Sequence, residues 1–342
     1  MKPGGLFSIK STSKGRGLIA TQTIEEGDLI LSEYPMYLSQ YPQNKLHFPA
    51  CPTCLAPIVH VNKYLYKMLE IETEYEQCLE VEACKNCGLQ YCSKSHLDAD
   101  VIHPAFCNNT AFISLIEWWI QIHSLPEWST PELPLRIVFD LSLKSDNLYT
   151  AFEDSLISNL LHKLDNKSFE DDVLNNITSN NFIEYYELCE LAFHQGTTKL
   201  LGHPVALPID LFKSIVLACA LNGQGCGSSP LDALRIMTDF EDDVLEEIAE
   251  TLQDEYSEFT HCEATAVYPT HAMINHSCLP NAICQFTNLN ELDLQDSKIE
   301  IVALKEIQKG QEIYISYNNS NEMANYNFEM YRFICECPEC KK

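Results

Sequence analysis

Short runs of apolar and β-branched residues toward both ends of the chain predict β-strands. Residues 18–21 and 29–31 form two such runs, and the polar stretch at 25–28 predicts the turn between them. The C-terminal third repeats the pattern with runs at 282–286, 299–302 and 313–317. We therefore expect strands and turns in the first 45 residues and strands again near the C-terminus.

The middle of the chain, residues 108–260, has the spacing of helices. In its clearest repeat, acidic residues separate apolar residues that recur three or four positions apart, namely Phe240, Val244, Leu245, Ile248 and Leu252. We expect the acidic side of this helix to be a solvated face, with docking of a basic partner as the alternative. Because helices separate the two strand-rich regions, strands distant in sequence must pair. This predicts an α+β fold with one interrupted domain rather than two successive domains.

The composition fits a folded protein, because 46% of the 342 residues are hydrophobic and 21% are charged. The 49 acidic and 22 basic residues give a net charge of −27. Such a surface repels phosphate backbones and attracts basic protein segments. We therefore expect a basic protein partner and no direct nucleic-acid binding.

No stretch of the sequence predicts a secretory signal or a membrane span. The N-terminal residues lack an apolar run. The longest apolar stretch, residues 112–122, is interrupted by Glu117 and Gln121. We expect an intracellular protein without membrane association, in which thiols stay reduced. The 16 cysteines then indicate metal binding rather than disulfides.

Eight cysteine and histidine residues between positions 46 and 107 are spaced as zinc ligands. Cys-x2-Cys occurs twice and is followed by Cys-x3-His and His-x3-Cys. Two tetrahedral zinc ions need eight ligands, and such closed sites stabilise folds rather than catalyse reactions. The eight residues are Cys51, Cys54, Cys84, Cys87, Cys92, His96, His103 and Cys107.

A second cysteine group lies near the C-terminus. Cys335, Cys337 and Cys340 leave a zinc ion one ligand short, so the fourth ligand must come from elsewhere in the chain. Most of the other cysteines lie in apolar runs and are expected to be small core residues.

Residues 275–281, Asn-His-Ser-Cys-Leu-Pro-Asn, are the most informative stretch. We reject His276 and Ser277 as a base and nucleophile pair, because adjacent residues rarely face each other. Glycines 223, 225 and 227 lack the spacing of a dinucleotide fingerprint. No His-Glu-x2-His pattern is present, so a zinc hydrolase or deaminase is not favoured.

The 275–281 motif, Tyr317 at the end of a strand-like run and the C-terminal Cys-x-Cys-x2-Cys together resemble the SET domain of lysine methyltransferases. Residues 14–18, Lys-Gly-Arg-Gly-Leu, resemble the first motif of that fold. The order of the eight zinc-ligand candidates resembles the MYND zinc finger. This layout is similar to the SET and MYND domain (SMYD) family. Within this family, the chain resembles most the branch of the fifth vertebrate member, which lacks the helical repeat domain of several others. Three features carry this resemblance: residues 221–227, the long insert between the first two cysteine pairs, and a sequence that stops two residues after Cys340.

The resemblance implies a β-rich SET domain that is interrupted by a MYND finger and a helical insert. The implied segments are the N-terminal part of the SET domain (1–45), the MYND-type finger (46–107), the helical insert (108–212), the core SET region (213–320) and a zinc-binding post-SET segment (321–342).

The resemblance also implies three structural zinc ions. In this family the finger pairs alternate, so Cys51, Cys54, Cys92 and His96 are assigned to one ion and Cys84, Cys87, His103 and Cys107 to the other. His96 stands where the family usually has cysteine, and Cys78 is the alternative ligand there. The third ion is assigned to Cys278, Cys335, Cys337 and Cys340.

The cofactor that the resemblance implies is S-adenosylmethionine. Tyr317 corresponds to the catalytic tyrosine, and Tyr331 and Phe333 are expected to line a channel for the substrate lysine. Either Lys14 or Arg16 is expected to meet the cofactor carboxylate. The other implied cofactor contacts are Gly15, Gly17, Asn222, Ile274, Asn275, His276, Tyr317 and Phe333.

These features predict a monomeric protein-lysine N-methyltransferase of the nucleus and cytoplasm. Its expected substrate is a basic protein, either a histone tail or a non-histone such as a ribosomal protein, and the finger is expected to bind proline-containing peptides. The alternative is a binding scaffold or transcriptional corepressor with an inactive SET domain. Intact Asn275, His276 and Tyr317 favour the enzyme.

Overall fold

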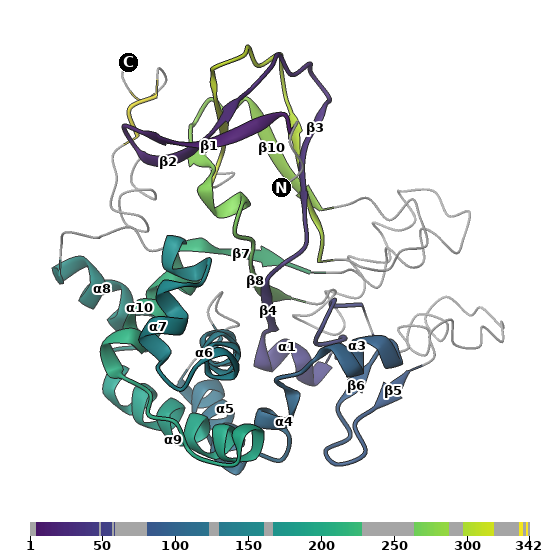
Figure 1. The fold of residues 1–342 in the computed structure, drawn as a ribbon, viewed down its shortest axis with the longest axis vertical. Coiled ribbons are helices and arrows are strands. Elements are labelled where there is room, and N and C mark those ends of the chain that lie inside the picture. The colour runs from purple at the N-terminus through teal and green to yellow at the C-terminus, as the bar shows by residue number, and fades with distance from the viewer. Residues whose placement is uncertain are drawn as a thin grey trace.

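The computed structural model has a β-rich part and a helical part, with a small cysteine-rich segment beside the helices (Figure 1). The structure describes residues 5–47, 49–56, 58, 81–122, 130–160, 167–227, 263–286, 297–317, 335–337 and 340. The acidic repeat at 240–252 lies outside these residues.

Two sheets form the β-rich part, and both join segments from opposite ends of the chain. The first has the order β1 (Phe7–Thr12), β2 (Gly15–Ala20), β12 (Glu312–Ile315), β9 (Asn275–His276). The second has the order β10 (Ala282–Phe286), β11 (Ile299–Ala303), β3 (Leu29–Glu33). The strand-like runs of the sequence are thus confirmed as strands, and distant strands pair as the pattern predicts. Leu18, Ile301 and Ile313, all fully buried, belong to the core of this part.

A third sheet has the order β4 (Tyr37–Gln40), β8 (Ala264–Val267), β7 (Gly223–Cys226). Strand β7 is a short strand within residues 108–260, the region for which the sequence predicts mainly helices. A Cβ atom at Gly223 would lie 2.6 Å from the Cys219 carbonyl oxygen and 2.7 Å from Thr265 Cγ2. The close approach of the backbone to these neighbours explains a glycine here, and it is invisible in the sequence.

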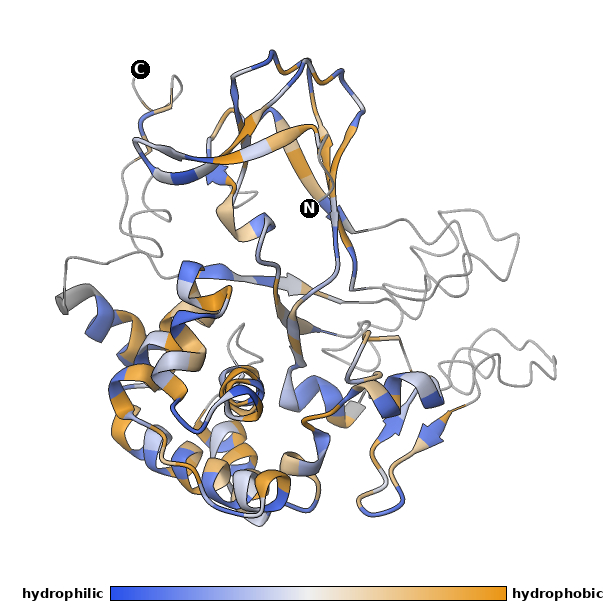
Figure 2. Cartoon of the chain, viewed as in Figure 1, coloured by the Kyte–Doolittle hydropathy of each residue, from blue (hydrophilic) through white to orange (hydrophobic). Residues whose placement is uncertain are grey.

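The helical part packs its apolar faces around one core. Figure 2 shows apolar and polar residues interspersed along these helices, as in amphipathic helices. Gly196 lies in the middle of a long helix because a Cβ atom there would lie 2.3 Å from Phe139 Cζ. The elements are α5 (Thr110–Ile122), α6 (Glu132–Lys144), α7 (Leu148–Glu153), η1 (Ile157–Leu160), α8 (Lys167–Ile177), α9 (Phe182–Leu201) and α10 (Ile209–Asn222). None of these described helices is both long and apolar enough to cross a bilayer.

The cysteine-rich segment packs directly against the helical part. Its elements are α1 (Pro42–His47), β5 (Glu82–Ala83), β6 (Gln90–Tyr91), α3 (Lys94–Ala99) and α4 (His103–Phe106). Just after α4, the Asn109 side-chain amide donates to the Ala105 and Ala192 carbonyls at 2.9 and 2.8 Å. Lys199 of α9 donates to the Cys107 carbonyl at 2.6 Å. Helix α1 begins at Pro42, where the sequence pattern predicted strands and turns.

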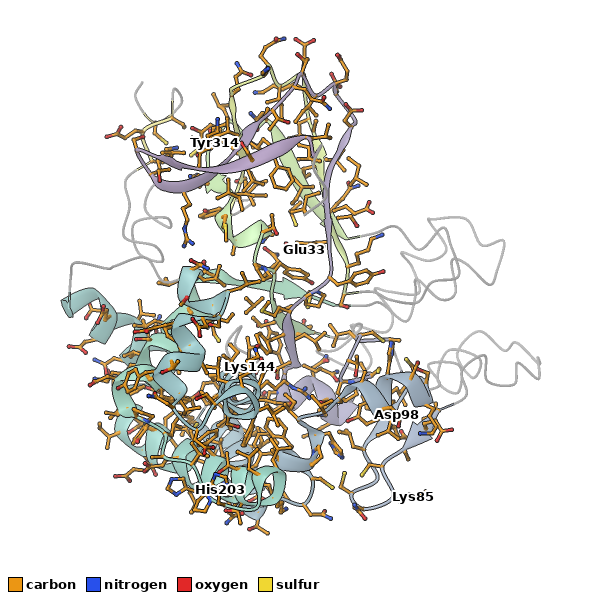
Figure 3. All side chains as sticks on the ribbon, in the orientation of Figure 1. Glu33, Lys85, Asp98, Lys144, His203 and Tyr314 are labelled. Carbon is orange, nitrogen blue, oxygen red and sulfur yellow. The ribbon has the colours of Figure 1, made fainter. Side chains whose placement is uncertain are left out.

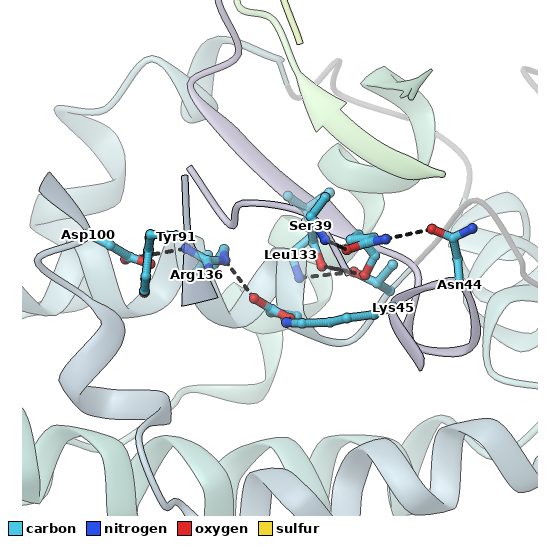
Figure 4. A network of polar contacts seen from close by, with 11 residues as sticks. Ser39, Asn44, Lys45, Tyr91, Asp100, Leu133 and Arg136 are labelled. Atoms are coloured by element: carbon cyan, nitrogen blue, oxygen red, sulfur yellow. Dashed lines mark hydrogen bonds and ion pairs between the residues drawn. The ribbon is translucent and has the colours of Figure 1, made fainter. Parts of the chain in front are cut away.

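A network of buried charges joins the cysteine-rich segment to helix α6 (Figure 4). Arg136 Nε donates to Glu132 at 2.8 Å, and its Nη1 lies 3.5 Å from Asp100, which also accepts from the Tyr91 hydroxyl at 3.0 Å. Burial alone would raise the pKa of Glu132, but Lys45 and Arg136 outweigh it and lower that pKa. Arg136 therefore compensates two carboxylates that come from separate segments of the chain.

We predict that Arg136→Met destabilises the protein by about 3 kcal/mol, because it leaves the buried Asp100 carboxylate without its cation and Glu132 with Lys45 alone. The measurement is urea denaturation of the zinc-loaded protein. The matched control is Lys144→Met on the same helix, which removes an ion pair to Asp140 from a half-exposed site and should cost less than about 1 kcal/mol. Equal losses in the two variants would contradict the role of the buried network.

Candidate functional site

Strand pairing brings three sequence motifs together. Strand β12 runs antiparallel to β2, with Ile313 opposite Leu18, and parallel to β9, with Ile315 opposite His276. The 14–18 motif at the start of β2, the 275–281 motif and the run that ends at Tyr317 therefore lie side by side.

Tyr317 is held at two points. Its hydroxyl donates to the Ile274 carbonyl at 2.7 Å, and its backbone N–H donates to His276 Nδ1 at 3.1 Å. The two rings lie 5.2 Å apart between centroids. These contacts fix the phenol against the loop that carries Asn275 and His276.

His276 connects Tyr317 to a cysteine cluster. Burial, and then the charge of Lys14, lower the pKa of His276 to about 4, so the imidazole is neutral near pH 7. Because Nδ1 accepts from Tyr317, the proton of the neutral ring belongs on Nε2. That atom lies 3.3 Å from Cys278 Sγ, so His276 bridges the backbone of Tyr317 and the Cys278 sulfur.

The turn between β1 and β2 contacts the same motif. Gly15 has a φ of +100°, which favours glycine. A Cβ atom at Gly17 would lie 2.4 Å from Glu312 Oε1 and 3.0 Å from Asn275 Nδ2. The Lys14 ammonium donates to the His276 carbonyl at 3.2 Å. A side chain at Gly17 would therefore have to displace the Glu312 carboxylate.

Asn275 and Asn222 are positioned by different parts of the chain. The Asn275 side-chain amide donates to the Arg16 carbonyl at 2.8 Å, so it belongs to the group around β2. The Asn222 amide donates to the Leu160 and Ala218 carbonyls, at 3.2 and 3.0 Å. The hydrogen bonds described for Asn222 thus lead to the helical part and not to the other expected cofactor residues. Tyr331 and Phe333 lie outside the described residues.

Sequence reasoning missed two polar residues of the site, Glu312 and Tyr314. Their carboxylate and hydroxyl are 2.7 Å apart, and the Lys14 ammonium lies 4.5 Å above the Tyr314 ring. Figure 3 labels Tyr314 within the β-rich part. Alternation along β12 gave a signal, because Ile313 and Ile315 are buried and residues 312 and 314 must face the other way.

Three clusters of four ligand atoms occur in the described residues, with the membership expected from the sequence. In each cluster the four atoms lie within 4.8 Å of one another. They are Cys51, Cys54, Cys92 and His96, then Cys84, Cys87, His103 and Cys107, and last Cys278, Cys335, Cys337 and Cys340. Cys78, the alternative to His96, lies outside the described residues.

The sulfur spacing of these clusters fits zinc. Tetrahedral Zn–S bonds of about 2.3 Å place neighbouring sulfurs about 3.8 Å apart. Cys54 and Cys92 are 3.6 Å apart, Cys84 and Cys107 are 3.8 Å apart, and Cys278 lies 3.7 Å from Cys335. Four sulfur or nitrogen donors close each site, so a bound zinc ion would stabilise the fold.

The group around Lys14 and Asn275 fits an S-adenosylmethionine site. The cofactor carries a carboxylate, for which Lys14 and Arg16 supply cations beside a glycine turn. The His276 carbonyl, which the Lys14 ammonium occupies here, is an acceptor for a polar donor of the ligand. The donor set therefore agrees with an amino-acid-like, polar ligand beside Tyr317.

Comparison with known proteins defines the class. The SET domain family model matches residues 15–318, and the chain belongs to the SET domain family. It is 27% identical to the Gallus gallus protein-lysine N-trimethyltransferase SMYD5 and 26% identical to the Homo sapiens SMYD5; both matches cover 96% of this chain and 84% of the relative. These similarities confirm the resemblance to the SMYD family.

Other matches are shorter or more distant. A Danio rerio protein, N-lysine methyltransferase SMYD2-B, is 37% identical over 79 residues, which are 22% of this chain and 16% of that protein. A further match is the crystal structure of the SET domain of LSMT bound to lysine and AdoHcy. The match covers 98% of this chain and 54% of the LSMT chain, with 12% identity and a TM-score of 0.37.

We predict that Cys278→Ser lowers the zinc content from three to two ions per chain, because it removes one of four ligands from the third cluster. Methyl transfer should fall with it, since His276 loses its sulfur partner. Elemental analysis of the purified protein measures the zinc. Cys284→Ser, a partly buried cysteine outside the three clusters, is the control and should keep three ions. Three ions in Cys278→Ser would contradict this ligand assignment.

His271 is a buried histidine just upstream of the motif. It begins η2 (His271–Met273), and the backbone N–H groups of Thr270 and His271 donate to the Glu33 carboxylate. Neither ring nitrogen has a hydrogen-bond partner within the part of the chain that the structure describes. Burial lowers the pKa of His271 to about 4. The unfolded chain thus binds a proton here near pH 6.5, and the folded chain does not.

We predict that the free energy of unfolding decreases as the pH falls from about 6.5 toward 4, because His271 binds a proton in the unfolded chain but not in the folded one. His271→Leu should remove this loss, so wild type should lose about 2 kcal/mol more than the variant between pH 7.5 and pH 5. Urea denaturation at both pH values gives the difference, and acid effects on the zinc sites cancel in it. Parallel losses in the two proteins would show that His271 titrates normally.

Proposed function

We propose that this protein is an S-adenosylmethionine-dependent protein-lysine N-methyltransferase. The observation that carries the proposal is Tyr317, whose hydroxyl is held at the Ile274 carbonyl beside the 275–278 loop in a SET domain. The SMYD5 relatives are named protein-lysine trimethyltransferases, which supports lysine as the acceptor.

Methylation of lysine requires a neutral amine. A free lysine has a pKa near 10.4, so deprotonation near pH 7.4 costs roughly 4 kcal/mol. S-adenosylmethionine, when bound, supplies a methyl group on a positively charged sulfur, from which the amine lone pair can displace it. The protein must therefore orient the amine and favour its uncharged form.

Tyr317 is placed to orient the amine. Its proton is donated to the Ile274 carbonyl, so the phenol oxygen can meet the incoming nitrogen only as a hydrogen-bond acceptor. The backbone contact with His276 keeps the ring in this position. Tyrosine suits this task because its ring tolerates methylated ammonium groups while its hydroxyl directs the amine.

The acidic surface supports a basic protein as the substrate. The net charge of −27 favours encounter with lysine-rich segments such as a histone tail or a ribosomal protein.

We further propose that the enzyme acts as a monomer in the nucleus and cytoplasm, and that the cysteine-rich finger at 46–107 binds proline-containing peptides.

We predict that Tyr317→Phe lowers methyl transfer at least 100-fold, because it removes the hydroxyl that orients the amine. The assay follows labelled methyl groups from S-adenosylmethionine into proteins of a cell extract. Tyr149→Phe, at an exposed tyrosine on α7, is the control and should label like wild type. Equal labelling by wild type and Tyr317→Phe would exclude Tyr317 from catalysis. Wild type that neither labels proteins nor binds the cofactor would favour a binding scaffold, whereas cofactor binding without labelling would show that the extract lacks the substrate.

A further inference from the structure

Glu312 lies at the start of β12 with both carboxylate oxygens engaged. Oε1 accepts from the Asn275 side-chain amide at 2.7 Å, and Oε2 accepts from the Tyr314 hydroxyl at 2.7 Å. Asn275 and Lys14, which lies over Tyr314, are both among the residues expected to bind the cofactor. The Glu312 carboxylate therefore contacts Asn275 directly and contacts Lys14 indirectly, through Tyr314.

The contact with Asn275 fixes the direction of its side chain. The same amide nitrogen donates to Glu312 and to the Arg16 carbonyl, which uses both of its protons. The side chain therefore cannot rotate without losing two hydrogen bonds. A Cβ atom at Gly17 would fall 2.4 Å from Glu312 Oε1, so the carboxylate fills the space that this glycine leaves.

The contact with Tyr314 leads to Lys14. Burial, and then the hydrogen bond to Glu312, raise the pKa of Tyr314 to about 12, so the hydroxyl stays a donor. The Lys14 ammonium lies 4.5 Å above the centre of this ring and donates to the His276 carbonyl. Glu312 therefore orients the aromatic face on which Lys14 rests.

The backbone of Glu312 is itself anchored to the 275–281 motif. The Asn281 side chain donates to the Glu312 carbonyl at 2.9 Å and accepts from the Tyr314 N–H at 2.7 Å. The first and last residues of the motif thus bind the same short segment of β12. This arrangement leaves Glu312 little freedom to move toward another partner.

We infer that Glu312 is a positioning residue that sets the orientation of Asn275 and Lys14 for S-adenosylmethionine. The inference rests on the proposed function. Glu312 acts through Asn275 and Tyr314 rather than by touching the cofactor. Its loss should weaken cofactor binding, while the zinc clusters and the affinity for the protein substrate remain unchanged.

The test is calorimetric titration of S-adenosylmethionine into zinc-loaded full-length protein, with KM values for cofactor and substrate. Glu312→Ala should weaken cofactor binding at least tenfold and raise the cofactor KM, and leave the substrate KM and the three zinc ions unchanged. Glu312→Gln keeps an oxygen for Asn275 and should stay within about threefold of wild type. Glu306→Ala, at an exposed carboxylate before β12, should bind like wild type.

Gly17→Ala provides a second test that does not depend on the folding of Glu312→Ala. Its methyl group should displace the carboxylate and weaken cofactor binding, and adding Glu312→Ala should cause no further loss, because both changes disrupt the same contact. Wild-type affinity in Glu312→Ala, a loss in Glu312→Gln as large as in Glu312→Ala, or multiplied losses in the double variant would each overturn the inference. If wild type itself fails to bind the cofactor, the proposed function fails instead.

Discussion

The pairing of β12 with β2 and β9 is the constraint on which the rest of the structure depends. It joins the two ends of a chain whose middle forms the finger and the helices. The two pairings place Gly17, Asn275 and Tyr317 within contact of shared neighbours, although up to 300 residues separate them. The site therefore forms only when the ends of the chain have found each other. Such long-range pairing is slow, and stable helices and zinc clusters between the ends shorten the effective search.

A side chain, His276, connects Tyr317 to the third cysteine cluster. His276 contacts the Tyr317 backbone on one side and Cys278 on the other. Lys14 contacts the His276 carbonyl, and the Glu312 carboxylate contacts Asn275 and Tyr314. Strand β9 and the residues just after it are thus held by a cysteine cluster, a cation and a carboxylate. This number of supports suits a site whose main task is to orient two reactants.

Local signals predicted much of this structure, and tertiary contacts account for the rest. The cysteine and histidine spacings gave the ligand pairs, and the resemblance to the MYND finger and the SET domain implied the membership of the three clusters. Alternating apolar runs gave the strands of the β-rich part. Strand β7, Arg136 and Glu312 were missed, since each depends on a partner far away in sequence: Thr265, Asp100 and Asn275. The cofactor role of Asn222 and the positions of Tyr331 and Phe333 remain predictions.

The cysteine-rich finger is a continuous segment of the sequence, but the contacts around helix α4 pack it against the helical part. Both ligands that α4 and its end supply, His103 and Cys107, sit on a short helix clamped to α9 through Asn109 and Lys199. On the other side, Asp100 completes the charge balance of Arg136 inside the helical part. The finger and the helices therefore pack against each other across one continuous interface. Evolution could not have exchanged this finger for another zinc module without also rebuilding the helix surface beneath it, so the two segments are expected to diverge together among relatives.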